Sequence, residues 1–379
     1  MYRMTCKRIG IFVLGIVMLT LPHASYAQAE VIPDVMTFTK ARVVEVQNQR
    51  TEEIPGTETP AEVQTLTVEI LRGEEKGKVV TFENDYIQLS EGETFYLRHI
   101  TNSIDAMDRY TVADPYRLDI LIGLGIAFLI LAAFFGGMQG VRGLASLGGS
   151  LILIFYLLIP GILGGLSPVL VAIGVATLII IVASYITHGF NTTTSAAVFG
   201  MIVTVLITGL AAYLVMISAN LSGYTSDENV YLNFNTHGAI DMVGLLFGGI
   251  MIGLLGVLYD SAISQAVAVE ELFRAGAHME RRHVYKRAIR IGREHIGALI
   301  NTLAIAYVGA ALPLLLLISN STSAGLAFVL NSELFATEII RVLIGSIGLI
   351  LAVPITTLIA SHMLVGLRGV PATHESHHH

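Results

Sequence analysis

Polar side chains inside long apolar stretches are the first feature of this sequence that points to chemistry. In one stretch, near 239–262 and its continuation, small and polar residues recur close to one helical face at i, i+3 and i+4 spacing: Gly249, Gly253, Gly256, Asp260, Ser264 and Glu271. The glycines predict close packing against a neighbouring helix. A carboxylate inside a bilayer costs roughly 2.5–3.5 kcal/mol, so Asp260 should face a bundle interior or a cavity. With amide and hydroxyl oxygens around it, such a carboxylate suits a small cation or carries a proton.

The helical rise of 1.5 Å per residue gives the depth of these groups in the membrane. Asp260 lies roughly 15 Å from a cytoplasmic boundary taken near Glu270, and polar residues of two later apolar runs reach a similar level. Together they form one predicted ion or solute site: Asp260, Ser264, Asn301, Thr302, Thr356 and Thr357. The alternative is that Asp260 hydrates at the surface or pairs with a basic residue of 281–293. Asn301 and Thr302 alone would be ordinary interhelical hydrogen-bonding groups.

Further polar residues are secondary candidates: Tyr259, Gln265, Glu271, Asp241, Glu338 and Arg341. The i, i+3 spacing of Glu338 and Arg341 favours an intrahelical ion pair that orients the last helix over a substrate contact. Asp241 is interpreted as a helix N-terminal charge, with a proton-sensing pair with His237 as the alternative. The hydroxyl-rich segment 187–194 favours helix capping over a short re-entrant turn.

Enzymatic motifs are missing from the sequence. It contains no G-x-x-x-x-G-K-[ST], no G-x-S-x-G and no H-E-x-x-H pattern, and Asp260 has no carboxylate partner at clearly matching depth. We therefore expect a protein that is not an enzyme and has no cofactor. The single cysteine, Cys6, lies in a segment expected to be removed, which leaves no thiol chemistry in the mature chain. Nothing supports nucleic-acid binding.

Seven apolar runs must position these groups, and each is close to the roughly 20 residues that cross a bilayer. They lie near 118–138, 144–165, 168–187, 196–218, 239–262, 296–318 and 338–362. Hydrophobic residues make up 54% of the chain and charged residues 13%, against about a quarter charged in soluble domains. We predict an α-helical polytopic membrane protein, with a seven-helix transmembrane domain over 118–368 and a tail, 369–379, that ends in a tag remnant.

The distribution of basic residues predicts the orientation. Lys and Arg gather in the segments expected inside, most densely at 274–293, whereas the loops 219–238 and 319–337 contain none. Residues 1–27 have the basic start, apolar run and small-residue cleavage site of a signal peptide, with an uncleaved anchor as the alternative. We expect a protein of the bacterial plasma (inner) membrane whose N-terminal domain is extracytoplasmic and whose C-terminus is cytoplasmic.

Residues 28–117 form the predicted extracytoplasmic domain. Runs of alternating character at 41–46, 64–70, 79–82 and 94–97 predict half-buried strands separated by polar turns. About five strands in this length suggest a small all-β domain, with an OB-like barrel as the first interpretation. Its fold alone names no ligand, and a structural cap or interaction module is the simplest role.

Long ordered blocks of sequence lie at 244–272, 292–313 and 330–359, with HGFN at 188–191 and the strand-rich 71–84 region as supporting stretches. In these blocks the chain resembles the YibE/F-like family of bacterial multi-pass membrane proteins. The resemblance implies a multi-pass inner-membrane protein, but no settled substrate. Tyr259 before Asp260 is a departure from the smaller or apolar residue expected there.

Two hypotheses of function follow. The leading one is a permease or channel for an ion or small solute, gradient-driven because no nucleotide site is present. The alternative is a membrane scaffold or assembly protein whose outer domain recruits an envelope protein. The expected partners are therefore the lipid bilayer, an ion or small solute, and an envelope protein, and a homo-oligomer is an open alternative.

Overall fold

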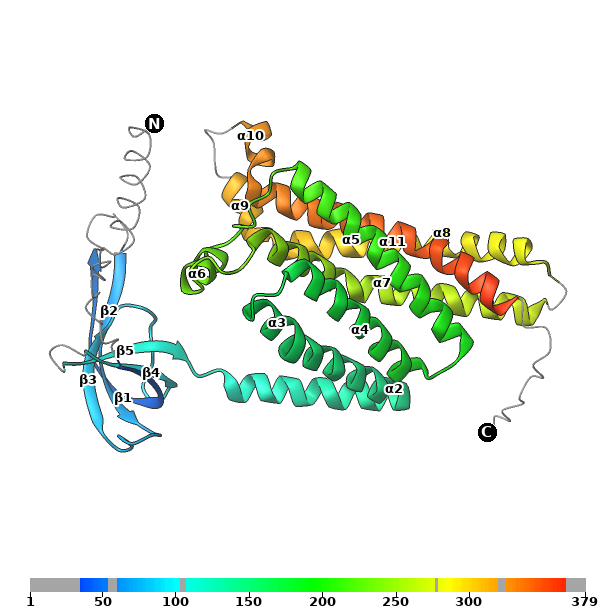
Figure 1. Ribbon diagram of the computed structural model, residues 1–379. Coiled ribbons are helices and arrows are strands. Elements are labelled where there is room, and N and C mark those ends of the chain that lie inside the picture. The colour runs from blue at the N-terminus through cyan, green and yellow to red at the C-terminus, as the bar shows by residue number, and fades with distance from the viewer. Residues whose placement is uncertain (1–34, 54–59, 103–106, 277–278, 320–324, 366–379) are drawn as a thin grey trace, which may run out of the picture. The chain divides into compact units, whose positions relative to one another are not determined.

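The computed structural model describes residues 35–53, 60–102, 107–276, 279–319 and 325–365 (Figure 1). The predicted signal peptide and the tail 369–379 lie outside these residues. The chain divides into two compact units, Met1–Ile126 and Ala127–His379. The first holds a β domain and the second a helical bundle, as the sequence predicted.

The β domain is one antiparallel five-stranded sheet with the strand order β3-β2-β1-β4-β5. The strands are β1 (Val35–Glu53), β2 (Pro60–Ile70), β3 (Val79–Asn84), β4 (Thr94–Thr101) and β5 (Asp108–Pro115). Register shifts in β1 between Val43 and Glu45 and between Val46 and Asn48 mark bulges, which bend a strand. Alternate residues such as Leu66, Val68 and Phe95 fill one core. The sheet therefore curves into a half-barrel, which confirms the predicted small β domain.

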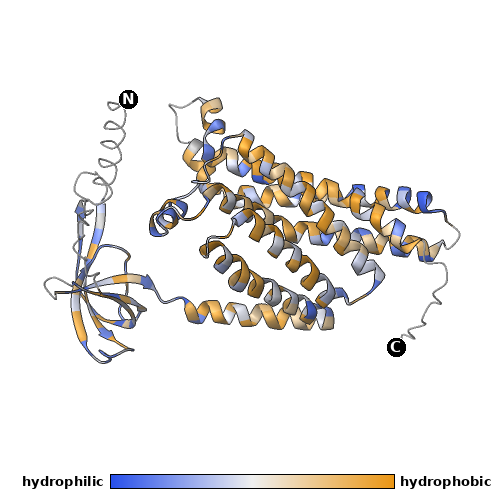
Figure 2. Cartoon of the chain, in the orientation of Figure 1, coloured by the Kyte–Doolittle hydropathy of each residue, from blue (hydrophilic) through white to orange (hydrophobic). Residues whose placement is uncertain are grey.

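The helical unit contains long apolar helices and short connecting ones (Figure 2). They are α2 (Leu118–Leu153), the π-helix η1 (Ile154–Leu158), α3 (Ile159–Leu163), α4 (Pro168–His188), α5 (Thr192–Ser218), α6 (Asp227–Asn235), α7 (Met242–Ala275), α8 (Arg281–Ala310), α9 (Leu312–Ser319), α10 (Leu326–Asn331) and α11 (Glu333–Leu364). Among the described residues, five helical segments are long and apolar enough to span a membrane: Leu118–Leu163, α4, α5, α7 and α11.

The difference between seven predicted runs and five spans has two local causes. The first two runs share Leu118–Leu163, which breaks at Gly137, where φ is +53°. The chain folds back there, since a Cβ at Gly140 would overlap the carbonyl of Ala132. The sixth run is divided between α8 and α9, and α8 begins with a strongly basic segment.

Helices α4, α5, α7 and α11 form the core of the bundle, and α8 packs on α7 and α11. Small residues allow close approach, as expected where lipid supplies no hydrophobic drive between helices. Gly200 of α5 lies against Thr356 of α11, and Gly348 of α11 lies against Thr208 of α5. α7 contacts α4, α5, α8 and α11, so it is the central helix of the unit.

Candidate functional site

One side of α7 carries small and polar residues that point away from the core. We call Gly249, Gly253, Gly256, Asp260 and Ser264 the open face of α7, because all five are exposed. A Cβ built at Gly249 or Gly256 would meet no heavy atom within 4 Å. The prediction that these glycines pack closely against a neighbouring helix is therefore wrong for Gly249 and Gly256. The helix uses its opposite, bulkier side for the core, with Ile250, Leu254 and Leu258 among the buried residues.

The threonines of the predicted polar layer lie elsewhere. Thr356 and Thr357 are 0% exposed. Thr356 faces α5, where a Cβ at Gly200 would stand 2.5 Å from its Oγ1, and Thr357 donates to the carbonyl of Val353 at 2.6 Å. The structure thus brings these two residues to the helix interface and not to the open face of α7.

On α8, Asn301 and Thr302 are exposed, and Thr302 donates a hydrogen bond to Ala298 of its own helix at 3.0 Å. Helix α8 approaches the open face further along, since the Tyr307 hydroxyl lies 2.9 Å from the position of a Cβ at Gly253. The helical rise predicted how deep these residues lie in the membrane. It did not predict which helix each of them faces.

Two secondary candidates beside Asp260 differ in environment. Gln265 is buried and donates from Nε2 to the carbonyl of Ala288 at 2.8 Å, which ties α7 to α8. The Tyr259 hydroxyl is buried without a hydrogen bond of standard geometry among the described residues, and its ring centroid lies 6.0 Å from that of His188. Gln265 therefore links two helices, while Tyr259 places a buried hydroxyl close to Thr187 and Asp260.

The Ala275 end of α7 holds a polar pocket of about 120 Å³. Thr193 donates to Glu270 at 2.6 Å, and Glu270 also pairs with Arg274 at 2.6 Å. His188 contributes to the lining, and Val267, seven residues beyond Asp260, extends the open face into it. Sequence reasoning missed Glu270 as a site residue, although its i, i+4 relation to Arg274 and the nearby threonines were visible signals.

The segment that forms one wall of this pocket is a helix cap. The Asn191 side chain accepts a hydrogen bond from the backbone N–H of Thr194 at 2.7 Å and donates to the carbonyl of His188 at 3.0 Å. This confirms the capping predicted for 187–194 and satisfies an N–H at the start of α5.

The Met242 end of α7 lies near three of the other secondary candidates, whereas Glu271 lies near the Ala275 end. Asp241 is exposed at the N-cap position of α7, and Glu271 is exposed near the far end. Arg341 and Glu338 form the predicted ion pair at 3.0 Å, with side chains 27% and 25% exposed. Glu333, which the sequence did not single out, accepts hydrogen bonds from the backbone N–H groups of Ser222 and Gly223 at 2.7 and 2.8 Å.

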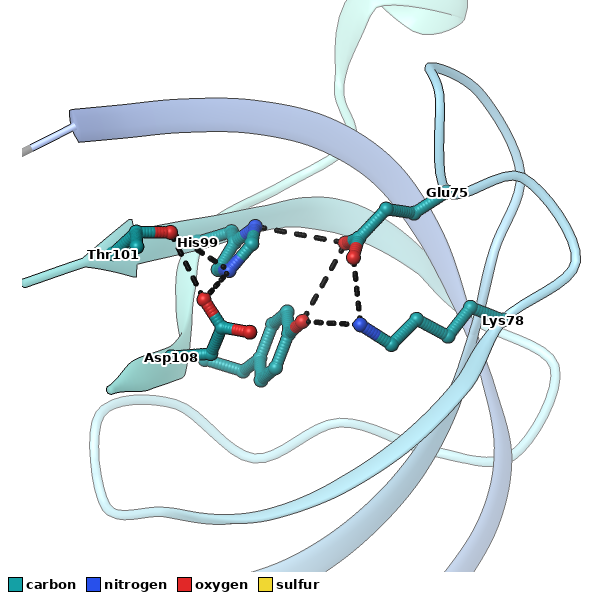
Figure 3. Close-up of polar contacts among 6 residues, drawn as sticks. Glu75, Lys78, His99, Thr101 and Asp108 are labelled. Carbon is teal, nitrogen blue, oxygen red and sulfur yellow. Dashed lines mark hydrogen bonds and ion pairs between the residues drawn. The ribbon is translucent and has the colours of Figure 1, made fainter. Parts of the chain in front are cut away.

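The β domain holds a separate polar cluster on β4, β5 and the β2–β3 turn (Figure 3). His99 lies between two carboxylates, with Nε2 at 2.8 Å from Asp108 and Nδ1 at 3.5 Å from Glu75. The hydrogen bond with His99, assisted by one from Thr101, lowers the pKa of Asp108. The hydrogen bond with Glu75 raises the pKa of Lys78 well above its usual range. Each charged group in the cluster therefore has a partner. Lys78 of the turn also donates to the Tyr110 hydroxyl of β5 at 2.8 Å, so the cluster joins β5 to the turn.

Comparison with known families covers both units. A family model described as YibE/F-like protein matches residues 124–366, and a model of the YibE/F family N-terminal domain matches residues 35–96. The chain belongs to the YibE/F-like family. No curated protein and no solved structure matches it. The open face and both ends of α7 in this YibE/F-like protein fall inside the larger matched range, so they belong to the family's membrane domain.

Proposed function

We propose that this YibE/F-like protein is a permease or channel in which an ion or small solute crosses the membrane along the open face of α7. The observation that carries the proposal is the exposure of Asp260 on the same helix face as three glycines, Gly249, Gly253 and Gly256. An ionised carboxylate facing lipid would cost roughly 2.5–3.5 kcal/mol, so this face is expected to meet water or another polypeptide. A second copy against it would enclose a path.

Polar groups at both ends of α7 support the same reading. Glu270 and His188 line the pocket at the Ala275 end, and Arg341 lies at the Met242 end. Between them Gly249 and Gly256 leave open space, and the Tyr307 hydroxyl of α8 lies close to Gly253. Since no nucleotide motif is present, transport would follow a gradient. The basic start of α8 favours a cytoplasmic Ala275 end and an extracytoplasmic β domain in the plasma membrane.

Flux of Na⁺, K⁺, Mg²⁺ and protons into proteoliposomes tests the proposal. Asp260→Asn removes the carboxylate, and Gly256→Leu fills the open face, so both should reduce flux of the transported ion. Gly174→Leu is the matched control, because Gly174 is also exposed in open space but lies on α4. Unchanged flux in Asp260→Asn, or equal losses in the two glycine variants, would contradict the proposed path.

A scaffold is the second candidate, and exposed apolar residues at the start of β1 favour it. Val35, Met36 and Phe38 are 62%, 50% and 58% exposed. An apolar strand start of this kind suits a protein partner. Deleting residues 31–112 separates the two candidates. Loss of a co-purifying envelope protein with unchanged flux would favour recruitment by the domain as an additional role. A phenotype that survives the deletion would contradict the scaffold hypothesis.

A further inference from the structure

Arg341 lies beside a second, larger pocket at the Met242 end of α7. The pocket has a volume of about 420 Å³ and is formed by η1, α3, α6 with the loop before it, α7, and Arg341 of α11. Its walls are mostly apolar, with Ile162, Leu246 and Ile252 as examples, and Gly249 leaves open space on one side. Small-molecule sites have about this size, apolar walls and a few polar groups that fix orientation. Arg341 is the only charged residue among the described residues that line it.

The guanidinium of Arg341 uses only part of its hydrogen-bonding capacity. Nη1 contacts both carboxylate oxygens of Glu338, at 3.0 and 3.3 Å. Nε is buried and has no partner among the described residues, and no partner of Nη2 is found there either. A buried donor left without a partner costs about 1–3 kcal/mol. The ion pair with Glu338 therefore uses Nη1, whereas Nε and Nη2 on the other edge of the guanidinium have no partner among the described residues.

The neighbouring polar side chain does not fill this role. The Asn229 amide donates to the carbonyl of Gly223 at 3.0 Å and to Thr225 at 3.2 Å, which fixes α6 to the preceding loop. Tyr307 lies under the guanidinium, with its ring centroid 5.9 Å from Cζ, and holds it from the other side. Arg341 is thus held by Glu338 and Tyr307 and lines the apolar pocket, while its Nε has no partner among the described residues.

We propose that this pocket binds a carboxylate or phosphate group attached to an apolar body, with the Nε and Nη2 edge of Arg341 as its anchor. A guanidinium holds such anions through two parallel hydrogen bonds, which a point charge cannot do. The anion belongs either to a phospholipid headgroup or to a soluble amphipathic acid. The site does not depend on transport, because a protein that moves nothing would still bind at Arg341.

Equilibrium titration of the full-length protein in neutral detergent tests the site. The anionic probes are phosphatidylglycerol and octanoate, with diacylglycerol and octanol as their uncharged counterparts. Wild type should bind at least one anionic probe and neither uncharged one. Arg341→Gln should weaken that binding by about tenfold or more, as expected for loss of a charged anchor. Arg290→Gln, at an exposed position on α8, should change it less than about twofold.

Two further variants keep the test decisive if Arg341→Gln misfolds with Glu338 left unpaired. Glu338→Gln releases Nη1 and should bind the probe at least as tightly as wild type. The double variant Glu338→Gln/Arg341→Gln removes both charges and should fold but not bind. Binding by phosphatidylglycerol alone assigns the site to lipid, and binding by octanoate assigns it to a soluble acid. Binding of neither anionic probe, equal binding of the uncharged probes, or binding retained by the double variant would overturn the site.

Discussion

Replacing Gly200 by alanine should separate α5 from α11. A Cβ at Gly200 would lie 2.5, 2.9 and 3.0 Å from Oγ1, Cα and Cβ of Thr356. Carbon atoms pack best at roughly 3.5–4.0 Å, so one helix must shift by roughly 0.5–1 Å. Overpacking of this kind costs about 1–3 kcal/mol. Because Thr356 contributes backbone as well as side-chain atoms to the contact, rotation of its side chain cannot relieve it.

The matched control is Gly174→Ala, at an exposed position on α4 with no heavy atom within 4 Å of the new Cβ. Alanine favours helix over glycine by about 1 kcal/mol in both variants, so the difference between them isolates the contact with Thr356. Reversible unfolding in mixed micelles should place Gly200→Ala about 1–3 kcal/mol below Gly174→Ala. Equal stabilities would refute the close approach of α5 and α11.

Two other predictions concern polar contacts. The pKa of Asp108 is lowered chiefly by its hydrogen bond with His99, so the stability from this carboxylate is present above its unfolded pKa near 4 and is lost as pH falls through the lower folded value. Protease resistance of the β domain should therefore be higher in wild type than in Asp108→Asn at pH 6, and the gap should close in acid; a gap constant with pH would contradict this. Gln265→Leu removes the side-chain donor to the Ala288 carbonyl and should cost about 0.5–1.5 kcal/mol, seen as faster hydrogen exchange at the start of α8, with the exposed Ser264→Ala as control. Unchanged exchange in Gln265→Leu would show that this bond does not hold α8.

The β domain could be predicted because its signal is local. Alternation along 64–70 and 94–97 assigns each side chain to one face of a strand, and β2 and β4 bury the expected residues. The family resemblance was also confirmed, because long blocks of sequence carry it. Both predictions depend on residues that are neighbours in the chain, and the sequence alone shows those neighbours.

The polar layer depended on contacts between helices, and there the sequence was insufficient. Helical rise places Asp260 and Thr356 at similar depth, but depth leaves open which neighbour each helix face meets. Thr356 faces Gly200 of α5, whereas Asp260 faces outward. Glycine is equally ambiguous, since it permits close approach at Gly200 and leaves open space at Gly256. Gly137 is a different case, because the reversal there falls at the end of the first predicted apolar run, 118–138.

The central position of α7 has a consequence for whatever meets its open face. Neighbouring helices α4, α5, α8 and α11 hold this helix, and Gln265 adds a hydrogen bond to α8. A ligand or a second copy that reaches Asp260 therefore meets a surface whose backbone is already ordered. Ordering of side chains and loops normally opposes association, and a preorganised surface reduces that entropic cost. Affinity at this face should then depend mainly on the fit and charge of the arriving group.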